Sequence, residues 1–150
     1  MRAILQRVSE ASVQINGDVF SYIKNGVLVL LGIEESDSPE DLNWLVRKIT
    51  NLRIFGDEHG KMNFSLGDIN GEVLVVSQFT LFASTKKGNR PSFIKSAKPD
   101  IAIPLYEGFI KKIQSEIHTT VKTGKFGADM KVELINDGPV TILLDSKNPE

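Results

Sequence analysis

The chain has 150 residues, 41% of them hydrophobic, a formal net charge of −1 and no cysteine. This length fits one domain, residues 1–150, and the lack of cysteine excludes a disulfide framework and any thiolate site, as expected in a reducing compartment. The near-zero charge excludes a protein that coats nucleic acid, and no apolar run approaches the roughly 20 residues of a membrane span, which indicates a cytoplasmic protein without a membrane partner.

The first half of the chain predicts a hairpin, a buried strand and a helix. Residues 11–22 contain alternating β-formers around an Asn-Gly pair, which suits a tight turn with positive φ. Residues 26–33 are almost continuously apolar, which is typical of a strand covered on both faces. Residues 38–41, a Ser-Pro-Glu-Asp run, supply an N-cap, a first-turn proline and early acids. The helix that follows carries apolar residues at helical spacing: Leu42, Leu45, Val46, Ile49 and Leu52.

The second half predicts another helix between strands. Residues 73–76 form an apolar strand, and residues 100–118 repeat apolar side chains every fourth position, with Pro104 near the first turn. Strands follow over residues 121–125, 130–135 and 140–144, separated by glycine-containing turns. The order favours an α+β fold, a single domain with a curled or barrel-like, mostly antiparallel β-sheet and two main helices.

The inventory of chemically active side chains excludes several enzyme classes. The chain has two histidines, His59 and His118, and neither has the spacing of a metal ligand. It also lacks a Walker A loop, a Gly-x-Gly-x-x-Gly loop and a Gly-x-Ser-x-Gly elbow. We therefore expect no metal and no cofactor.

The segment Ser77-Gln78-Phe79-Thr80 follows directly after the apolar strand 73–76, where a rigid strand gives way to a loop that can present functional groups. The hydroxyl of Ser77 or Thr80 could attack an ester if a base removed its proton, but the sequence shows no such base. Both hydroxyls could equally bond to nearby backbone.

A basic run lies further along the chain. Between residues 82 and 99 there is no acidic side chain, and the basic ones are Lys86, Lys87, Arg90, Lys95 and Lys98. Such a run can be a solvated surface loop or a contact for nucleic-acid phosphates, and charge alone leaves both open.

Several segments, in this order, resemble the D-aminoacyl-tRNA deacylases, also called D-tyrosyl-tRNA deacylases. They are residues 60–66 (GKMNFSL), 75–81 (VVSQFTL), 88–93 (GNRPSF), 123–130 (TGKFGADM) and 136–141 (NDGPVT). The resemblance extends along nearly the whole chain and implies the deacylase fold. It also implies hydrolysis of the ester between a D-amino acid and the 3′-terminal ribose of tRNA, with glycine mischarged on tRNA as a second substrate.

The same resemblance implies a homodimer with each active site near the subunit interface. Gly138 and Pro139, joined by a cis peptide bond, would enter the partner's pocket and reject L-aminoacyl esters. Arg7 matches an arginine that holds this Gly-Pro turn in place. A fixed backbone that collides with an L side chain discriminates by excluding the wrong substrate, and glycine escapes because it has no side chain.

For the chemistry, the resemblance implies a catalytic segment at Ser77, Gln78, Phe79 and Thr80. Backbone N–H groups there would stabilise the oxyanion, and the 2′-hydroxyl of the tRNA ribose would assist the proton transfer. Phe126 and Met130 would bind the terminal adenosine. Two alternatives stay open: a non-catalytic module that binds RNA ends, and an esterase with a Thr or Ser nucleophile.

Overall fold

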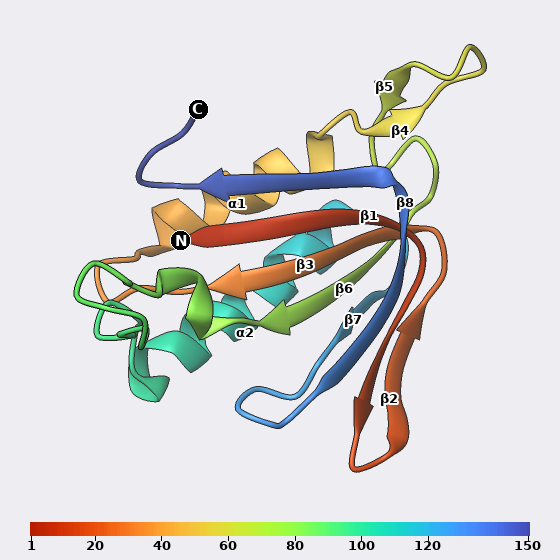
Figure 1. The fold of residues 1–150 in the computed structure, drawn as a ribbon. Helices are drawn as coiled ribbons and strands as arrows, with labels where there is room; N and C mark the ends of the chain where they lie inside the picture. The colour runs from red at the N-terminus through yellow and green to blue at the C-terminus, as the bar shows by residue number, and fades with distance from the viewer.

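The computed structural model describes residues 1–150 (Figure 1). Its elements in chain order are β1 (Arg2–Ile15), β2 (Asp18–Ile23), β3 (Gly26–Gly32), α1 (Pro39–Asn51), β4 (Phe55–Gly56), β5 (Met62–Phe64), β6 (Glu72–Ser77), the 3₁₀ helix η1 (Phe79–Phe82), α2 (Pro99–Glu116), β7 (Val121–Thr123) and β8 (Lys131–Asp145). Neither helix is long and apolar enough to cross a membrane.

The predicted hairpin is present as β1 and β2. Asn16 and Gly17 form its turn, with φ values of 53° and 86°. These positive values explain the residue types, because asparagine and glycine adopt them most readily. Pairing irregularities within β1 divide this long strand, so that its first half pairs with β3 and its second half with β2.

The main sheet is curled and nearly closed, as predicted. Its strand order is β2-β1-β3-β6-β7, and β8 pairs with the other edge of β1. The β3–β6 and β6–β7 pairs are parallel, whereas the pairs made by β1 are antiparallel. The Ser21 hydroxyl of β2 donates to the Thr123 carbonyl of β7 at 2.9 Å, which brings the two ends of the strand order together.

Apolar side chains fill both faces of this sheet. A larger cluster lies between the sheet and the two helices, and it includes Val29 and Val75 from strands and Leu45 and Phe109 from helices. A smaller cluster, which includes Ile23 and Leu74, fills the inside of the curl. The continuous apolar run of β3 follows from this arrangement, because both of its faces are covered.

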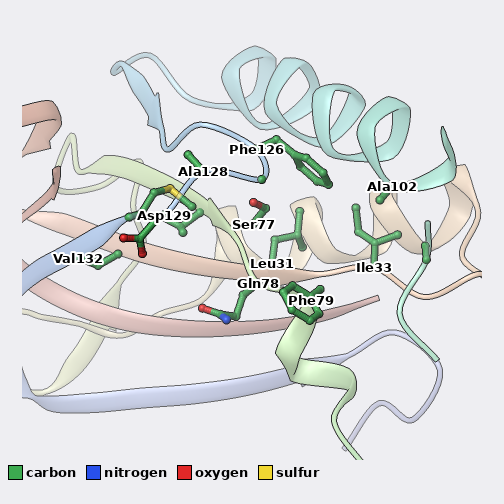
Figure 2. A pocket seen from close by; sticks show the side chains of 14 residues that line it. Leu31, Ile33, Ser77, Gln78, Phe79, Ala102, Phe126, Ala128, Asp129 and Val132 are labelled. Carbon is green, nitrogen blue, oxygen red and sulfur yellow. The ribbon is translucent and has the colours of Figure 1, made fainter. Parts of the chain in front are cut away.

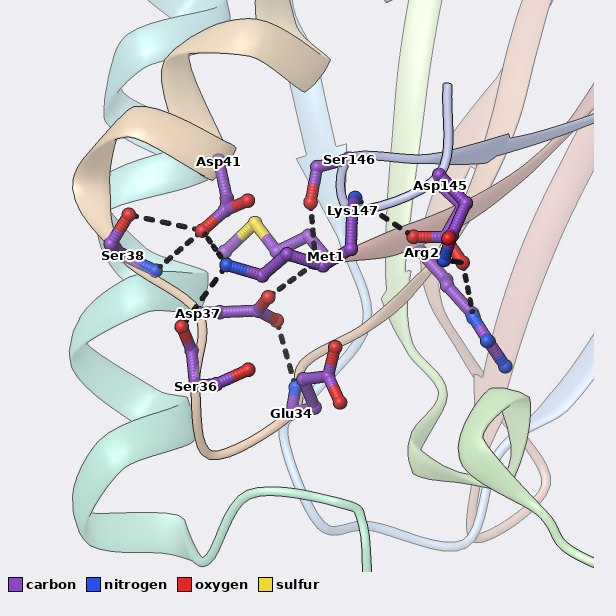
Figure 3. A network of polar contacts seen from close by, with 11 residues as sticks. Met1, Arg2, Glu34, Ser36, Asp37, Ser38, Asp41, Asp145, Ser146 and Lys147 are labelled. Carbon is purple, nitrogen blue, oxygen red and sulfur yellow. Dashed lines mark hydrogen bonds and ion pairs between the residues drawn. The ribbon is translucent and has the colours of Figure 1, made fainter. Parts of the chain in front are cut away.

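The start of α1 is held by a network of polar contacts (Figure 3). The Asp41 carboxylate accepts hydrogen bonds from the Ser38 N–H at 2.9 Å and from Lys147 at 2.8 Å. Burial by itself would raise the pKa of Asp41, but the bonds from Lys147 and Ser38 outweigh it and hold the pKa well below its usual range. Beside it, the Met1 ammonium pairs with Asp37, so the first and last segments of the chain are tied to the start of α1.

Three details differ from the sequence-based expectations. Pro104 lies inside α2 and not at its first turn, since the helix begins at Pro99. The strands expected at residues 130–135 and 140–144 belong to one strand, β8, whose pairing with β1 is interrupted between Asn136 and Thr141. The short hairpin formed by β4 and β5 was not predicted, because strands of two and three residues carry no periodic signal.

Candidate active site

A cavity of 310 Å³ lies at the carboxyl ends of β3 and β6 (Figure 2). The sheet below it, α2 beside it and the loop of residues 124–130 form its walls. Crevices at the carboxyl ends of parallel strands are common binding sites, because several loops leave the sheet there. The lining residues are Leu31, Ile33, Val76, Ser77, Gln78, Phe79, Ala97, Ala102, Phe126, Gly127, Ala128, Asp129, Met130 and Val132.

The predicted catalytic segment begins where β6 ends. Ser77 is the last residue of β6 and pairs with Leu31 of β3. The Gln78 N–H donates to the Leu31 carbonyl at 2.7 Å, which extends the parallel ladder by one bond. The backbone donor of Gln78 is therefore already in use, whereas the half-buried Ser77 side chain borders the cavity.

The 3₁₀ helix η1 continues from this strand end. Its first two N–H groups, those of Phe79 and Thr80, have no acceptor within the chain, as is usual for the first residues of a helix. The Gln78 side-chain amide donates to the Thr80 hydroxyl at 2.5 Å. No histidine or carboxylate bonds to that hydroxyl, so no general base is positioned on Thr80 within this chain.

Contacts from other elements fix η1 in place. Arg2 donates to the Leu81 carbonyl at 3.1 Å and lies 4.7 Å over the Phe82 ring. A Cβ on Gly32 would lie 3.0 Å from the Gln78 carbonyl oxygen, so glycine lets η1 pack directly on β3. The Ser96 hydroxyl donates to the Phe79 carbonyl at 2.8 Å. The backbone donors of η1 are thus held rigidly.

The loop of residues 124–130 contributes Phe126 and Met130 to the lining of the cavity. Tyr106 of α2 packs behind Phe126, with ring centroids 5.6 Å apart. Burial raises the pKa of Tyr106 to about 12, so its hydroxyl stays protonated and donates to the Val75 carbonyl at 3.1 Å. An aromatic ring and a thioether therefore face a largely apolar space, which suits the face of a base.

Gly138 and Pro139 form an exposed turn within β8, and their peptide bond is cis. The Arg7 guanidinium donates to the Asp137 carbonyl and to the Ile54 carbonyl, each at 2.6 Å. The Asn136 side chain closes the turn, because its oxygen accepts the Val140 N–H at 2.8 Å. The cis bond agrees with what the resemblance implied, and Arg7 bonds to the carbonyl of Asp137, the residue before the Gly-Pro pair.

Within a single chain, this turn lies far from the cavity. Arg7 pairs with Val27 on β3, whereas Leu31 borders the cavity four residues further along that strand. At about 3.3 Å per residue, these two rows of the sheet are about 13 Å apart along the strand. Figure 1 shows the bend of β8 and the 3₁₀ segment after β6 at opposite ends of the sheet. The predicted site residues therefore form two separate groups.

The basic run lies beside the cavity mouth. Its loop is closed by two hydrogen bonds between Ser84 and Ser92, of 2.8 and 2.9 Å. The Ala97 N–H attaches it to the Ile33 carbonyl, just after the end of β3, at 2.9 Å. The Phe93 ring meets the Phe79 ring edge-on, with centroids 5.1 Å apart. The basic side chains themselves are exposed: Lys86, Lys87, Arg90, Lys95 and Lys98.

Sequence reasoning missed several lining residues. Leu31, Ile33 and Ala102 are ordinary core residues by type, and only the strand pairing and the helix packing bring them to the cavity. Asp129 also borders it, with its carboxylate paired to Lys131 at 2.9 Å. The structure contains no group of three His, Asp or Glu side chains placed to hold a metal ion.

Comparison with known proteins gives a consistent result. A family described as D-Tyr-tRNA(Tyr) deacylase matches residues 4–145. A D-aminoacyl-tRNA deacylase from Flavobacterium psychrophilum is 61% identical over 150 residues, covering 100% of both chains. A solved structure titled c-Myc DNA Unwinding Element Binding Protein is 44% identical, with a TM-score of 0.92 and coverage of 97% of this chain and 98% of that one. Another, titled as a probable eukaryotic D-amino acid tRNA deacylase, has a TM-score of 0.79 at 19% identity over 95% of this chain and 97% of that one, and so shares the fold.

Proposed function

The chain belongs to the D-Tyr-tRNA(Tyr) deacylase family, and we propose from this that it hydrolyses the ester between a D-amino acid and the 3′-terminal ribose of tRNA. The observation that carries the proposal is the cavity at the ends of β3 and β6, which is lined by Ser77, Gln78 and Phe79 together with Phe126 and Met130. The products are free D-amino acid and reusable tRNA. The enzyme is thus a proofreading hydrolase that acts in the cytoplasm, where aminoacyl-tRNA is used.

The N–H groups of Phe79 and Thr80 are the donors for the developing oxyanion. These two groups begin η1 and have no acceptor in the chain. Contacts with Arg2, Gly32 and Ser96 hold this segment in place. Donors that are already oriented stabilise charge without reorganising when the ester carbonyl is attacked. The Gln78 N–H has a smaller part in this chemistry than its neighbours, because it already bonds to Leu31.

The substrate itself assists the proton transfer. The Thr80 hydroxyl accepts a hydrogen bond from the Gln78 amide and has no base beside it, which argues against a covalent acyl-enzyme at this residue. The 2′-hydroxyl of the ribose lies next to the ester by covalent structure and assists attack by water. The Ser77 side chain then shapes the cavity, whereas Thr80, which is not among the lining residues, holds the Gln78 amide through its hydroxyl.

The Gly138-Pro139 turn supplies the filter against L-amino acids from a second copy of the chain. Within one chain the turn lies at the other end of the sheet from the cavity, so a homodimer is needed to bring the two together. Carbonyl oxygens of a fixed turn can bind the substrate ammonium group. An L side chain then collides with backbone that Arg7 and Asn136 prevent from moving, whereas a D side chain or glycine does not.

The remaining contacts position the tRNA end. Phe126 and Met130, which line the cavity, receive the terminal adenosine. The basic side chains of residues 86–98, which are exposed, contact phosphates of the acceptor end. Phosphate contacts orient a nucleic acid without reading its sequence, so the enzyme accepts tRNAs of many sequences. This is why a chain with a net charge of −1 can use a nucleic-acid substrate.

Single-turnover deacylation of matched D-tyrosyl-, L-tyrosyl- and glycyl-tRNA, after metal chelation, tests the proposal. We expect rapid loss of the D and glycyl esters while the L ester survives. Equal hydrolysis of the D and L esters would contradict the stereochemical filter and support a general esterase. An acyl-enzyme trapped by acid quench would assign the chemistry to a Thr or Ser nucleophile.

The second candidate is a module that binds nucleic-acid ends without turnover. The basic loop beside the cavity favours it, and one similar solved structure is named as a DNA unwinding element binding protein. Such a module predicts binding of the aminoacylated end and a deacylation rate equal to that of the free ester. The same single-turnover measurement therefore separates the two.

A further inference from the structure

The loop of residues 124–130 is fixed at its first residue by a shared acceptor. The Val75 carbonyl accepts the Gly124 N–H at 2.9 Å and the Tyr106 hydroxyl at 3.1 Å. A carbonyl oxygen has two lone pairs, so both bonds can form at once. Because Tyr106 is buried in α2, this carbonyl joins β6, α2 and the start of the loop. The backbone at Gly124 therefore has little freedom to shift.

Met130 lies directly over this fixed backbone. A Cβ built on Gly124 would lie 2.5 Å from the Met130 sulfur, 3.6 Å from its terminal methyl carbon and 3.7 Å from the Val76 Cγ2. The sulfur thus occupies the space that any side chain at residue 124 would need. Gly124 does not have a positive φ, so its backbone conformation does not require glycine. The packing of Met130 is what requires it.

We infer that Gly124 is a positioning residue for the terminal nucleoside, because its bare Cα seats the Met130 thioether in the cavity wall. Gly124 touches no substrate and acts only through Met130. This inference rests on the proposed function, in which Met130 receives the terminal adenosine. It adds a reason for the glycine that precedes Phe126 in the loop.

The site should respond to a side chain at residue 124 by moving Met130 rather than by unfolding. Methionine has three rotatable side-chain bonds and rearranges readily, whereas the backbone of Gly124 is held by Val75. The displaced thioether then enters the cavity or leaves its wall. In either case the surface offered to the base changes, while η1 keeps its own contacts with Arg2 and Ser96.

The test compares Gly124→Ala with wild type in steady-state hydrolysis of D-tyrosyl-tRNA. We expect KM to rise roughly fivefold or more while kcat changes by less than about twofold, since binding of the nucleoside and not the chemistry is affected. Gly67→Ala is the matched control, because its added Cβ would meet nothing nearer than 3.9 Å and Gly67 lies outside the cavity lining. Thermal unfolding of each variant checks that the fold is kept.

The decisive measurement is Gly124→Ala in a Met130→Ala background. If residue 124 acts through the thioether, adding Gly124→Ala to the Met130→Ala variant should change KM by less than about twofold. An unchanged KM for Gly124→Ala alone, or the same rise in both backgrounds, would overturn the inference. If the wild-type protein did not hydrolyse D-tyrosyl-tRNA, the proposed function itself would be overturned. The two failures are therefore distinct.

Discussion

The cavity and the Gly138-Pro139 turn are built in opposite ways. Packed side chains from the sheet, α2 and the 124–130 loop wall the cavity, so formation of the core shapes it. The turn is exposed and is held by polar groups, the Arg7 guanidinium and the Asn136 side chain. These polar contacts fix the turn firmly, although the turn itself buries little apolar surface in its own chain. The difference fits the proposal that the cavity is formed within one chain and that the turn acts on the cavity of a second copy.

Gly138→Ala should have the largest effect on activity. Gly138 has φ +148°, and an added Cβ would lie 2.8 Å from the Val140 Cγ2 and 3.1 Å from the Arg7 guanidinium. The turn must therefore change shape, and with it the surface that is proposed to enter the partner's cavity. We expect kcat/KM for D-tyrosyl-tRNA to fall by roughly 100-fold or more, as for loss of a group that positions the substrate.

Mixed dimers test whether that loss occurs in the partner's site. Phe79→Pro removes one oxyanion donor at a position where a helix tolerates proline. A dimer of one Gly138→Ala and one Phe79→Pro subunit has one intact cavity that faces one intact turn. Random assembly at equal amounts should restore about a quarter of the wild-type sites. No recovery from two inactive parents would show that turn and cavity of the same chain act together.

Arg7→Lys should have the next largest effect. One guanidinium donates to the Asp137 and Ile54 carbonyls, and a lysine ammonium cannot match this planar geometry. We expect kcat/KM for the D ester to fall by roughly 10-fold. Hydrolysis of the L ester should rise relative to that of the D ester, because a loosened turn rejects the L side chain less firmly. The ratio of D to L single-turnover rates measures this. A ratio equal to that of wild type would separate Arg7 from the filter.

Thr80→Val should have a smaller effect on the cavity side of the comparison. The substitution removes the hydroxyl that accepts from the Gln78 amide but keeps the backbone N–H of η1. If that N–H performs the catalysis, kcat should fall by no more than roughly 10-fold. Loss of activity to the uncatalysed rate, in a variant with normal thermal unfolding, would mark Thr80 as the nucleophile.

The same contrast decides what the sequence could predict. Local signals identified the Asn-Gly hairpin turn, the cap of α1 and the strand that presents Ser77, because propensity and periodicity act within a few residues. The resemblance supplied Arg7 and the cis bond at Gly138-Pro139, which residue type alone would not have chosen.

What the sequence could not supply depends on long-range packing. The joining of residues 131–145 into one strand follows from pairing with β1 along most of its length. The engaged donor at Gln78 depends on its register with Leu31. The fit of Met130 over Gly124 depends on how the 124–130 loop folds back. No local pattern encodes such contacts between distant residues.

Asp41→Asn should leave both the cavity and the turn intact, so we expect it to have the smallest effect on activity. Its carboxylate accepts from Ser38 and Lys147 at the start of α1, and it is not among the residues that line the cavity. Losing these contacts should cost about 1 kcal/mol of unfolding free energy at pH 7, as for loss of a helix cap, with kinetic constants unchanged. Because the folded-state pKa of Asp41 is lowered, its contribution is full above the unfolded pKa of about 4 and fades as pH falls further. Urea unfolding of both proteins should therefore show curves that converge below about pH 4, and a gap that persists at low pH would assign the stabilisation to packing instead of the carboxylate charge.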